Sequence, residues 1–168
     1  MTRRQWLGFL SSLGFASAAT RAAHAASAAA GKPELPRIEP LLLTDAQWRQ
    51  RLTPAQYHVL REAGTERAST SPLNAEKRKG SFHCAGCDLA LFSSSTKYES
   101  GTGWPSFFDT LPGVFKTKRD FVIGYPRTEY SCARCGGHHG HVFNDGPKPT
   151  GLRYCNNGVA LKFVPEAA

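Results

Sequence analysis

The sequence predicts one mainly β domain of antiparallel strands that follows a few short helices. Three observations lead to this prediction. The chain has 168 residues, the length of one ordinary domain. From Phe82 onward it consists of short runs separated by Gly, Pro, Asn and Asp, a pattern typical of antiparallel strands. Two Cys-x-x-Cys pairs stand far apart in that same half, as expected if a metal joins distant parts of a sheet.

The first 25 residues have the layout of an export signal. Arg3 and Arg4 form a basic start, residues 6–15 are a short apolar core, and the Ala-His-Ala triplet at 23–25 offers a cleavage site. The paired arginines resemble the twin-arginine export motif. We expect residues 1–25 to be a twin-arginine-type signal peptide and the mature chain to be periplasmic. A disordered Ala-rich leader is the alternative.

Residues 26–40, rich in Ala and Pro, are expected to be a flexible linker, which leaves 41–165 as the folded domain.

The net charge of +8 would suggest nucleic acid as a partner. Without residues 1–25, 18 basic residues face 13 acidic ones, a net charge of +5. Four thiolates on one divalent metal would lower this to about +3. No apolar run reaches the roughly 18 residues of a membrane-spanning helix. We therefore expect neither nucleic acid nor, after cleavage, a membrane as partner.

Two capping boxes predict the helices. Thr44 is followed three residues later by Gln47, and Thr53 by Gln56, with Pro54 at the first helical position of the second helix. We expect that helix to cover 54–63 and to end at a Gly64 cap.

The runs at 113–115, 120–125 and 159–164 are expected to be strands, because turn residues bound each of them.

Four cysteines predict one structural metal site. Cys84 and Cys87, like Cys132 and Cys135, have the two-residue spacing of a zinc knuckle. Two knuckles together form a closed tetrahedral site for one Zn²⁺, and a closed site stabilises the fold without catalysing a reaction. Redox pairs or structural disulfides are the alternatives, since the expected compartment is oxidising. Export of the folded protein favours zinc, because the metal could be loaded in the reducing cytosol.

Cys155 has no partner thiol and lies among residue types that suit catalysis. Arg153 and Asn157 alternate onto the same face of a strand as Cys155. Cations and hydrogen-bond donors lower the pKa of a cysteine and make it a nucleophile. Upstream, His138 and His141 could donate a proton to a substrate oxygen. An inert buried cysteine, and an adventitious metal site in the His-rich turn, remain the alternatives.

Several motifs, in order, resemble those of the B-type methionine sulfoxide reductases over about residues 41–164. After Gly64-Thr65-Glu66 and the first knuckle comes Thr96-Lys97-Tyr98-Glu99-Ser100-Gly101-Thr102-Gly103-Trp104-Pro105-Ser106-Phe107. After the second knuckle come His138-His139-Gly140-His141-Val142-Phe143, Asp145-Gly146-Pro147 and Pro149-Thr150-Gly151-Leu152-Arg153-Tyr154-Cys155. The family fold implies two antiparallel sheets in a β-tent-like arrangement, with zinc away from the active site.

The resemblance implies a role for each matching residue. Cys155 corresponds to the nucleophile that attacks the sulfur of methionine-R-sulfoxide, and His141 to the acid that protonates its oxygen. The substrate-binding shell is implied to be Trp104, His138, Asp145, Arg153 and Asn157. The implied product on the enzyme is a sulfenic acid, which an external thiol, a thioredoxin-like protein or a small thiol, would reduce. The implied substrate is oxidised protein or peptide, with the free amino acid left open, and we expect a monomer.

Three positions depart from the family pattern. Many members carry a second, resolving cysteine where this chain has Thr102, which alters the catalytic cycle. His139 replaces an aliphatic residue, and Asn144 replaces a proline; we expect both to be tolerated in loops.

Two rival functions are a zinc-ribbon module that binds nucleic acid or protein and a zinc hydrolase. The zinc-ribbon module is opposed by three features: Cys155, the Trp104 motif and the leader. The zinc hydrolase is opposed by the absence of a carboxylate–histidine motif.

Overall fold

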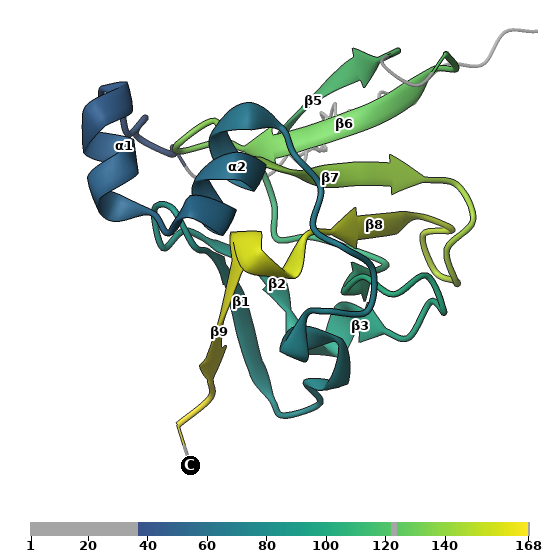
Figure 1. Cartoon of the computed structure of the whole chain (residues 1–168). Helices are drawn as coiled ribbons and strands as arrows, with labels where there is room; N and C mark the ends of the chain where they lie inside the picture. The colour runs from purple at the N-terminus through teal and green to yellow at the C-terminus, as the bar shows by residue number, and fades with distance from the viewer. Residues whose placement is uncertain (1–36, 122–123, 168) are drawn as a thin grey trace, which may run out of the picture. The chain divides into compact units, whose positions relative to one another are not determined.

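The computed structural model describes residues 37–121 and 124–167, and it confirms the expected mainly β fold with two antiparallel sheets. In the smaller sheet the strands have the order β2 (Ala90–Ser93), β1 (Gly80–Cys84), β9 (Leu161–Pro165). In the larger sheet the order is β3 (Lys97–Tyr98), β4 (Ser106–Phe107), β8 (Arg153–Asn156), β7 (His138–Phe143), β6 (Arg127–Cys132), β5 (Phe115–Asp120). Figure 1 shows the helices beside these strands.

Both predicted capping boxes are present. Helix α1 (Asp45–Arg51) begins after Thr44, and α2 (Pro54–Glu62) begins after Thr53. In each, the threonine hydroxyl accepts a hydrogen bond from the backbone N–H three residues on, at 3.3 Å in α1 and 3.2 Å in α2. Three short 3₁₀ helices complete the described elements: η1 (Pro72–Ala75), η2 (Ser94–Thr96) and η3 (Gly158–Ala160).

The predicted cap at Gly64 is wrong by one residue. Helix α2 ends at Glu62, and Ala63 takes the left-handed conformation with φ of 54°. Gly64 is needed for space instead, because a Cβ atom there would lie 2.2 Å from Nε2 of His58.

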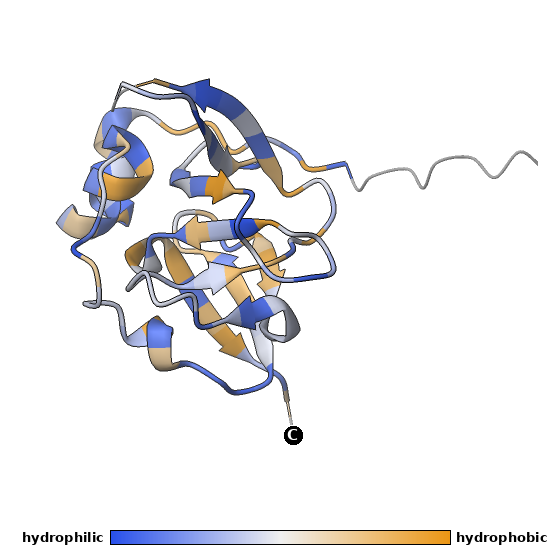
Figure 2. Ribbon diagram, turned by 90° about the vertical axis from the view of Figure 1, so that its right-hand side faces the viewer, coloured by the Kyte–Doolittle hydropathy of each residue, from blue (hydrophilic) through white to orange (hydrophobic). Residues whose placement is uncertain are grey.

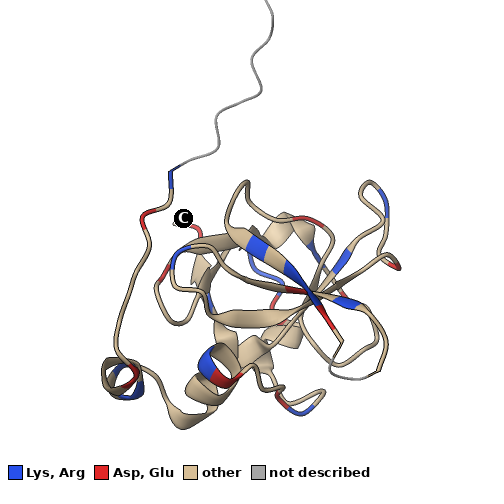
Figure 3. Ribbon diagram, turned by 90° about the horizontal axis from the view of Figure 1, so that it is seen from above, with Lys and Arg blue, Asp and Glu red and all other residues tan. Residues whose placement is uncertain are grey.

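The strand predictions were partly wrong. The run 113–115 lies mostly before β5. Of the run 120–125, Asp120 is the last residue of β5, 121 is not in a strand, 124–125 form a bend, and 122–123 lie outside the described residues. Strand β9 begins two residues into the run 159–164, after η3. Strand β5 was missed because it carries Lys116, Lys118 and Arg119 and therefore lacks an apolar pattern. It is an edge strand, where charged side chains oppose pairing with another chain. Figure 3 shows basic and acidic residues distributed over several elements.

An aromatic core joins the two sheets. Phe82 of β1 lies 4.9 Å from Phe107 of β4, and Phe92 of β2 stacks on Phe107 at 4.0 Å, measured between ring centroids. Phe115 and Tyr130 extend this cluster, at 4.8 Å from each other. Figure 2 shows the apolar residues mainly in the strands. Because the inner strands β4, β7 and β8 are fixed by this core, side chains at their ends are held in place.

The predicted signal peptide and most of the predicted linker lie outside the described residues; 37–40 carry no helix or strand. Within 37–121 and 124–167, no helix has both the length and the apolar character needed to cross a membrane.

Candidate active site and metal centre

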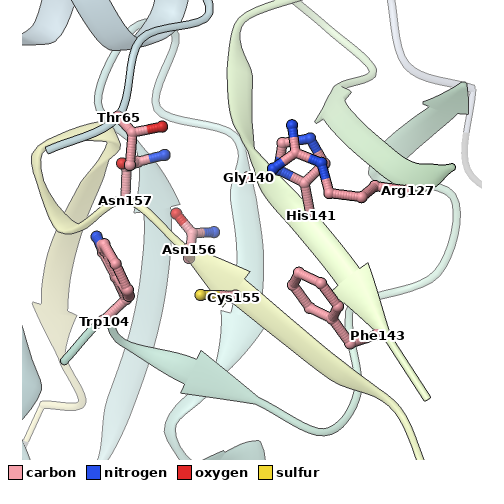
Figure 4. A pocket seen from close by; sticks show the side chains of 9 residues that line it. All are labelled: Thr65, Trp104, Arg127, Gly140, His141, Phe143, Cys155, Asn156 and Asn157. Carbon is pink, nitrogen blue, oxygen red and sulfur yellow. The ribbon is translucent and has the colours of Figure 1, made fainter. Parts of the chain in front are cut away.

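A cavity of about 140 Å³ lies where β8 and β7 meet the Trp104 loop. It is lined by Thr65, Trp104, Arg127, Gly140, His141, Phe143, Cys155, Asn156 and Asn157. Figure 4 shows Cys155 at its centre, with Trp104 on one side and Phe143 and His141 on the other. The cavity therefore combines one thiol, aromatic rings and polar groups.

The position of Cys155 follows from the register of the larger sheet. Cys155 of β8 pairs with Ser106 of β4 on one side and with His141 of β7 on the other. Gly140 permits the close approach of β7 and β8, because a Cβ atom there would lie 1.9 Å from the carbonyl oxygen of Cys155. Burial raises the pKa of the Cys155 thiol, while the charge of Arg153 and hydrogen bonds from Thr102 and Arg153 oppose that rise.

Arg153 and Asp145 lie beside the thiol and do not line the cavity. Two bonds of 2.8 Å join the Arg153 guanidinium to the Asp145 carboxylate, and the guanidinium lies 4.4 Å from the ring centroid of Phe143. The pKa of Asp145 is lowered, chiefly by the bonds from Arg153. Asp145 therefore fixes Arg153, and Arg153 holds a positive charge near Cys155.

Trp104 and Asn157 are held by the loop that precedes η1. The Trp104 indole N–H donates to the backbone oxygen of Glu66 at 3.1 Å, and the Asn157 side-chain oxygen accepts from the Glu66 backbone N–H at 2.9 Å. The Asn157 amide nitrogen donates to the backbone oxygen of His139 at 2.9 Å. Both side chains predicted from the sequence therefore line the cavity, in fixed orientations.

His141 belongs to a charged group that the sequence did not predict. Its Nε2 atom lies 2.7 Å from Oδ2 of Asp120, and that same oxygen accepts from the Arg127 guanidinium at 2.5 Å. Burial lowers the pKa of His141, and the bond to Asp120 opposes this. Of these two partners only Arg127 lines the cavity, and Asp120 lies behind His141. The sequence of a strand gives no local signal for either position, so Asp120 and Arg127 could not be singled out.

His138 does not line the cavity. It is buried, and its Nδ1 atom lies 3.0 Å from Glu129, which Lys118 also contacts at 3.1 Å. Burial raises the pKa of Glu129, but the bonds from His138 and Lys118 outweigh it and lower that pKa overall. The His138 and His141 rings lie 5.6 Å apart between centroids. His138 therefore lies behind the cavity wall, next to His141.

The four paired cysteines meet at one point. Their sulfur atoms all lie within 4.8 Å of one another, with 3.6 Å between Cys84 and Cys135 and 3.5 Å between Cys87 and Cys132. Tetrahedral coordination with metal–sulfur bonds of about 2.3 Å places sulfurs about 3.8 Å apart. All four side chains are buried. The donor set and spacing fit a closed metal site.

This site joins the two sheets. Cys84 ends β1 of the smaller sheet, and Cys132 ends β6 of the larger one. The two knuckles have the same turn. The Asp88 N–H donates to the carbonyl oxygen of Cys84, and the Gly136 N–H donates to that of Cys132, each at 2.8 Å. Asp88 and Gly136 both have positive φ. The cysteines do not line the cavity around Cys155.

His139, one of the unusual positions, lies between the metal site and β8. It is fully buried, with Nε2 3.4 Å from the Cys84 sulfur and Nδ1 3.4 Å from the Asn156 side-chain oxygen. It is thus part of the core and not of a loop, contrary to the expectation from the sequence.

Comparison with known proteins gives consistent matches. A SelR domain model matches residues 52–165. The peptide methionine sulfoxide reductase MsrB of Agrobacterium fabrum is 55% identical over 123 residues, which are 73% of this chain and 91% of that protein. The MsrB of Leptospira interrogans is 54% identical over 73% of this chain and 95% of its own length. The chloroplastic reductase B1 of Arabidopsis thaliana is 51% identical over 72% and 60% respectively. The chain therefore belongs to the SelR domain family, the family of the B-type methionine sulfoxide reductases.

Proposed function

We propose that this protein reduces methionine-R-sulfoxide in oxidised proteins to methionine, with Cys155 as the nucleophile. The observation that carries the proposal is the cavity that places the Cys155 thiol between the Trp104 indole and the polar groups of β7. A methionine sulfoxide has an apolar methyl group beside a strongly polar S=O group, and this cavity offers partners for both.

The reaction balances with one proton. The Cys155 thiolate attacks the sulfoxide sulfur, the S–O bond breaks, and the oxygen with one proton remains on Cys155 as a sulfenic acid while methionine leaves. The cysteine sulfur is oxidised and the substrate sulfur is reduced. His141, supported by Asp120, supplies the proton, and Arg127 adds a fixed positive charge next to the same carboxylate.

The other cavity residues bind the substrate. Trp104 packs against the S-methyl group, and its indole N–H is already used by Glu66, so the ring offers an apolar face. Asn157 holds the loop against β7 through His139. Three further predicted residues act from behind the cavity wall. His138 acts through His141, and the pair of Asp145 and Arg153 acts through Cys155.

An external thiol restores the enzyme. One thiol condenses with the Cys155 sulfenic acid to a mixed disulfide and releases water, and a second thiol reduces that disulfide. Thr102 cannot perform the first step, and the other described cysteines lie in the metal cluster. A thioredoxin-like protein or a small thiol is the proposed reductant.

The metal is proposed to be one structural Zn²⁺ per chain, held by Cys84, Cys87, Cys132 and Cys135. Four thiolates in tetrahedral arrangement favour zinc, and no ligand position is left open for a substrate. The protein is further proposed to act as a monomer; sedimentation at equilibrium would show a larger mass if this is wrong.

Residues 1–25 are proposed to direct twin-arginine export to the periplasm. The order of paired arginines, apolar core and small-residue triplet supports this. A reporter fused to residues 1–40 should be exported, and replacement of both Arg3 and Arg4 by Lys should abolish export. Export that persists in this variant would contradict the twin-arginine route.

The decisive experiment measures turnover of the separate R and S diastereomers of a methionine sulfoxide peptide, with dithiothreitol as reductant. Activity on the R form alone is expected, and its loss in Cys155→Ser with metal content unchanged. Activity on the S form alone would contradict the proposal.

A further inference from the structure

His139 connects the cluster of four cysteines to the strand that carries Cys155. Its side chain is fully buried, with Nε2 3.4 Å from the Cys84 sulfur and Nδ1 3.4 Å from the side-chain oxygen of Asn156. Asn156 follows Cys155 in β8 and lines the cavity. One imidazole ring therefore lies between a sulfur of the cluster and the wall of the cavity, and the reaction described above does not use it.

N–H groups contact two of the cysteine sulfurs. The backbone N–H of Gly137 donates to the Cys135 sulfur at 3.4 Å, and His139 contacts the Cys84 sulfur through its ring. Every residue except proline has a backbone N–H, so the first contact does not depend on the side chain. The second depends on the histidine, because the aliphatic residue that it replaces in the family pattern has no donor.

The contact with Cys84 determines which ring nitrogen carries the proton. A metal-bound thiolate has no proton of its own, so its sulfur can only accept a hydrogen bond. Nε2 of His139 must therefore be the protonated nitrogen, and Nδ1 of the neutral ring is then an acceptor.

Asn156 offers the matching donor. Its amide nitrogen is buried and has no hydrogen-bond partner among the described residues. Turned by 180°, the same amide places this nitrogen beside Nδ1 of His139, where the oxygen otherwise lies. In that orientation the amide nitrogen donates to Nδ1, and the ring proton stays on Nε2, next to the sulfur.

We propose that His139 is a positioning residue for the metal site: its Nε2–H group donates a hydrogen bond to the Cys84 thiolate, while Asn156 holds the ring in place. The proposal rests on the proposed metal site, in taking the four cysteines as thiolates on one Zn²⁺.

The surroundings of the ring favour a strong and well-oriented bond. The His139 ring lies 5.6 Å from the Phe115 ring and 6.5 Å from the Tyr130 ring, measured between centroids. Such a site excludes water, and a hydrogen bond is electrostatically stronger there. A bond to a thiolate is also charge-assisted, which makes it roughly twice as strong as a neutral one. Partners of this kind typically change the metal affinity of a site by roughly 10- to 100-fold.

The direct test is the tautomer of His139 in the zinc-loaded protein, read from the NMR shifts of its ring nitrogens. Comparison with His139→Gln identifies the signals. We expect a proton on Nε2 and none on Nδ1. An Nε2 atom without a proton would overturn the proposal, because the sulfur would then have no donor.

Zinc affinity, measured by competition with a chelator, tests the energetic contribution. His139→Leu restores an aliphatic side chain and should lower the affinity about tenfold. His139→Gln keeps an N–H donor near the position of Nε2 and should retain most of the affinity. His58→Leu is the matched control: it removes an exposed imidazole that contacts Glu62 on α2, and it should leave the affinity unchanged.

An unchanged affinity in His139→Leu, with circular dichroism intact, would overturn the proposal. So would equal losses in His139→Leu and His139→Gln, since packing and not the N–H donor would then be responsible. Unmodified protein that binds no zinc would overturn the proposed metal site together with this proposal, whereas zinc-loaded protein with an unprotonated Nε2 would overturn this proposal alone. None of these measurements uses a sulfoxide, so failure of the proposed activity is detected separately, by the diastereomer assay.

Discussion

The backbone of Glu66 orients Trp104: its carbonyl oxygen accepts the indole N–H at 3.1 Å. The carboxylate of the same residue accepts the N–H groups of Gly158 at 2.5 Å and Val159 at 3.0 Å, immediately after the strand that carries the nucleophile. One residue therefore fixes the distance between the aromatic wall of the cavity and the end of β8.

Removal of the Glu66 carboxylate should weaken substrate binding more than the chemical step. Glu66→Ala leaves two partly buried N–H groups without an acceptor, which costs about 1–3 kcal/mol of stability. It also loosens the loop that holds Trp104, so KM should rise by roughly an order of magnitude while kcat falls less. Steady-state kinetics and thermal denaturation test this, with the exposed Glu39→Ala as control. A loss in kcat alone would contradict the positioning role.

The metal should be required for the fold. Chelation, or Cys84→Ser, should unfold the protein, because the site joins the ends of β1 and β6 in different sheets. Circular dichroism and bound-metal analysis measure this, and Cys155→Ser is the control that should keep both metal and fold. Metal-free protein that stays folded and active would show the prediction to be wrong.

The enzyme should stop at a sulfenic acid when no reductant is present. One equivalent of sulfoxide should convert Cys155 to a species that dimedone labels, because the other described cysteines are held in the metal cluster. Mass spectrometry and a zinc-release dye follow the two events together. A disulfide between Cys155 and a knuckle cysteine, accompanied by zinc release, would show that the resolving thiol comes from the metal site.

The pH profile of kcat/KM should show a plateau. The active form needs Cys155 deprotonated and His141 protonated, while burial raises the pKa of the first and lowers the pKa of the second. The rate should rise with pH until the His141 pKa, stay level, and fall only above the Cys155 pKa.

Asp120→Asn should change this profile in a defined way. The Asp120 carboxylate raises the pKa of His141, so its removal should lower that pKa further. The break on the acid side should move to lower pH, and the plateau should fall about tenfold for each pH unit by which the break moves. Asp109→Asn, an exposed acid elsewhere, is the control. A fallen plateau with an unmoved break would indicate that Asp120 only supports the structure.

The sequence by itself determined the features that depend on local spacing. Both capping boxes could be predicted because a threonine and a glutamine three residues apart satisfy each other's backbone N–H groups. The cluster of four cysteines could be predicted because two residues between thiols suffice to direct both at one centre. The motifs around Cys155 and Trp104 indicated the family for the same reason, since each is a short continuous segment.

The tertiary structure alone decided which distant residues share the site. Strand register places His141 opposite Cys155, and the β5–β6 pairing sets Asp120 opposite Arg127, where that carboxylate binds both Arg127 and His141. The same packing put His138 behind the cavity wall and His139 in the core, although both belong to one motif. Adjacent side chains of a strand point to opposite faces, and a sequence does not state which face the fold will cover.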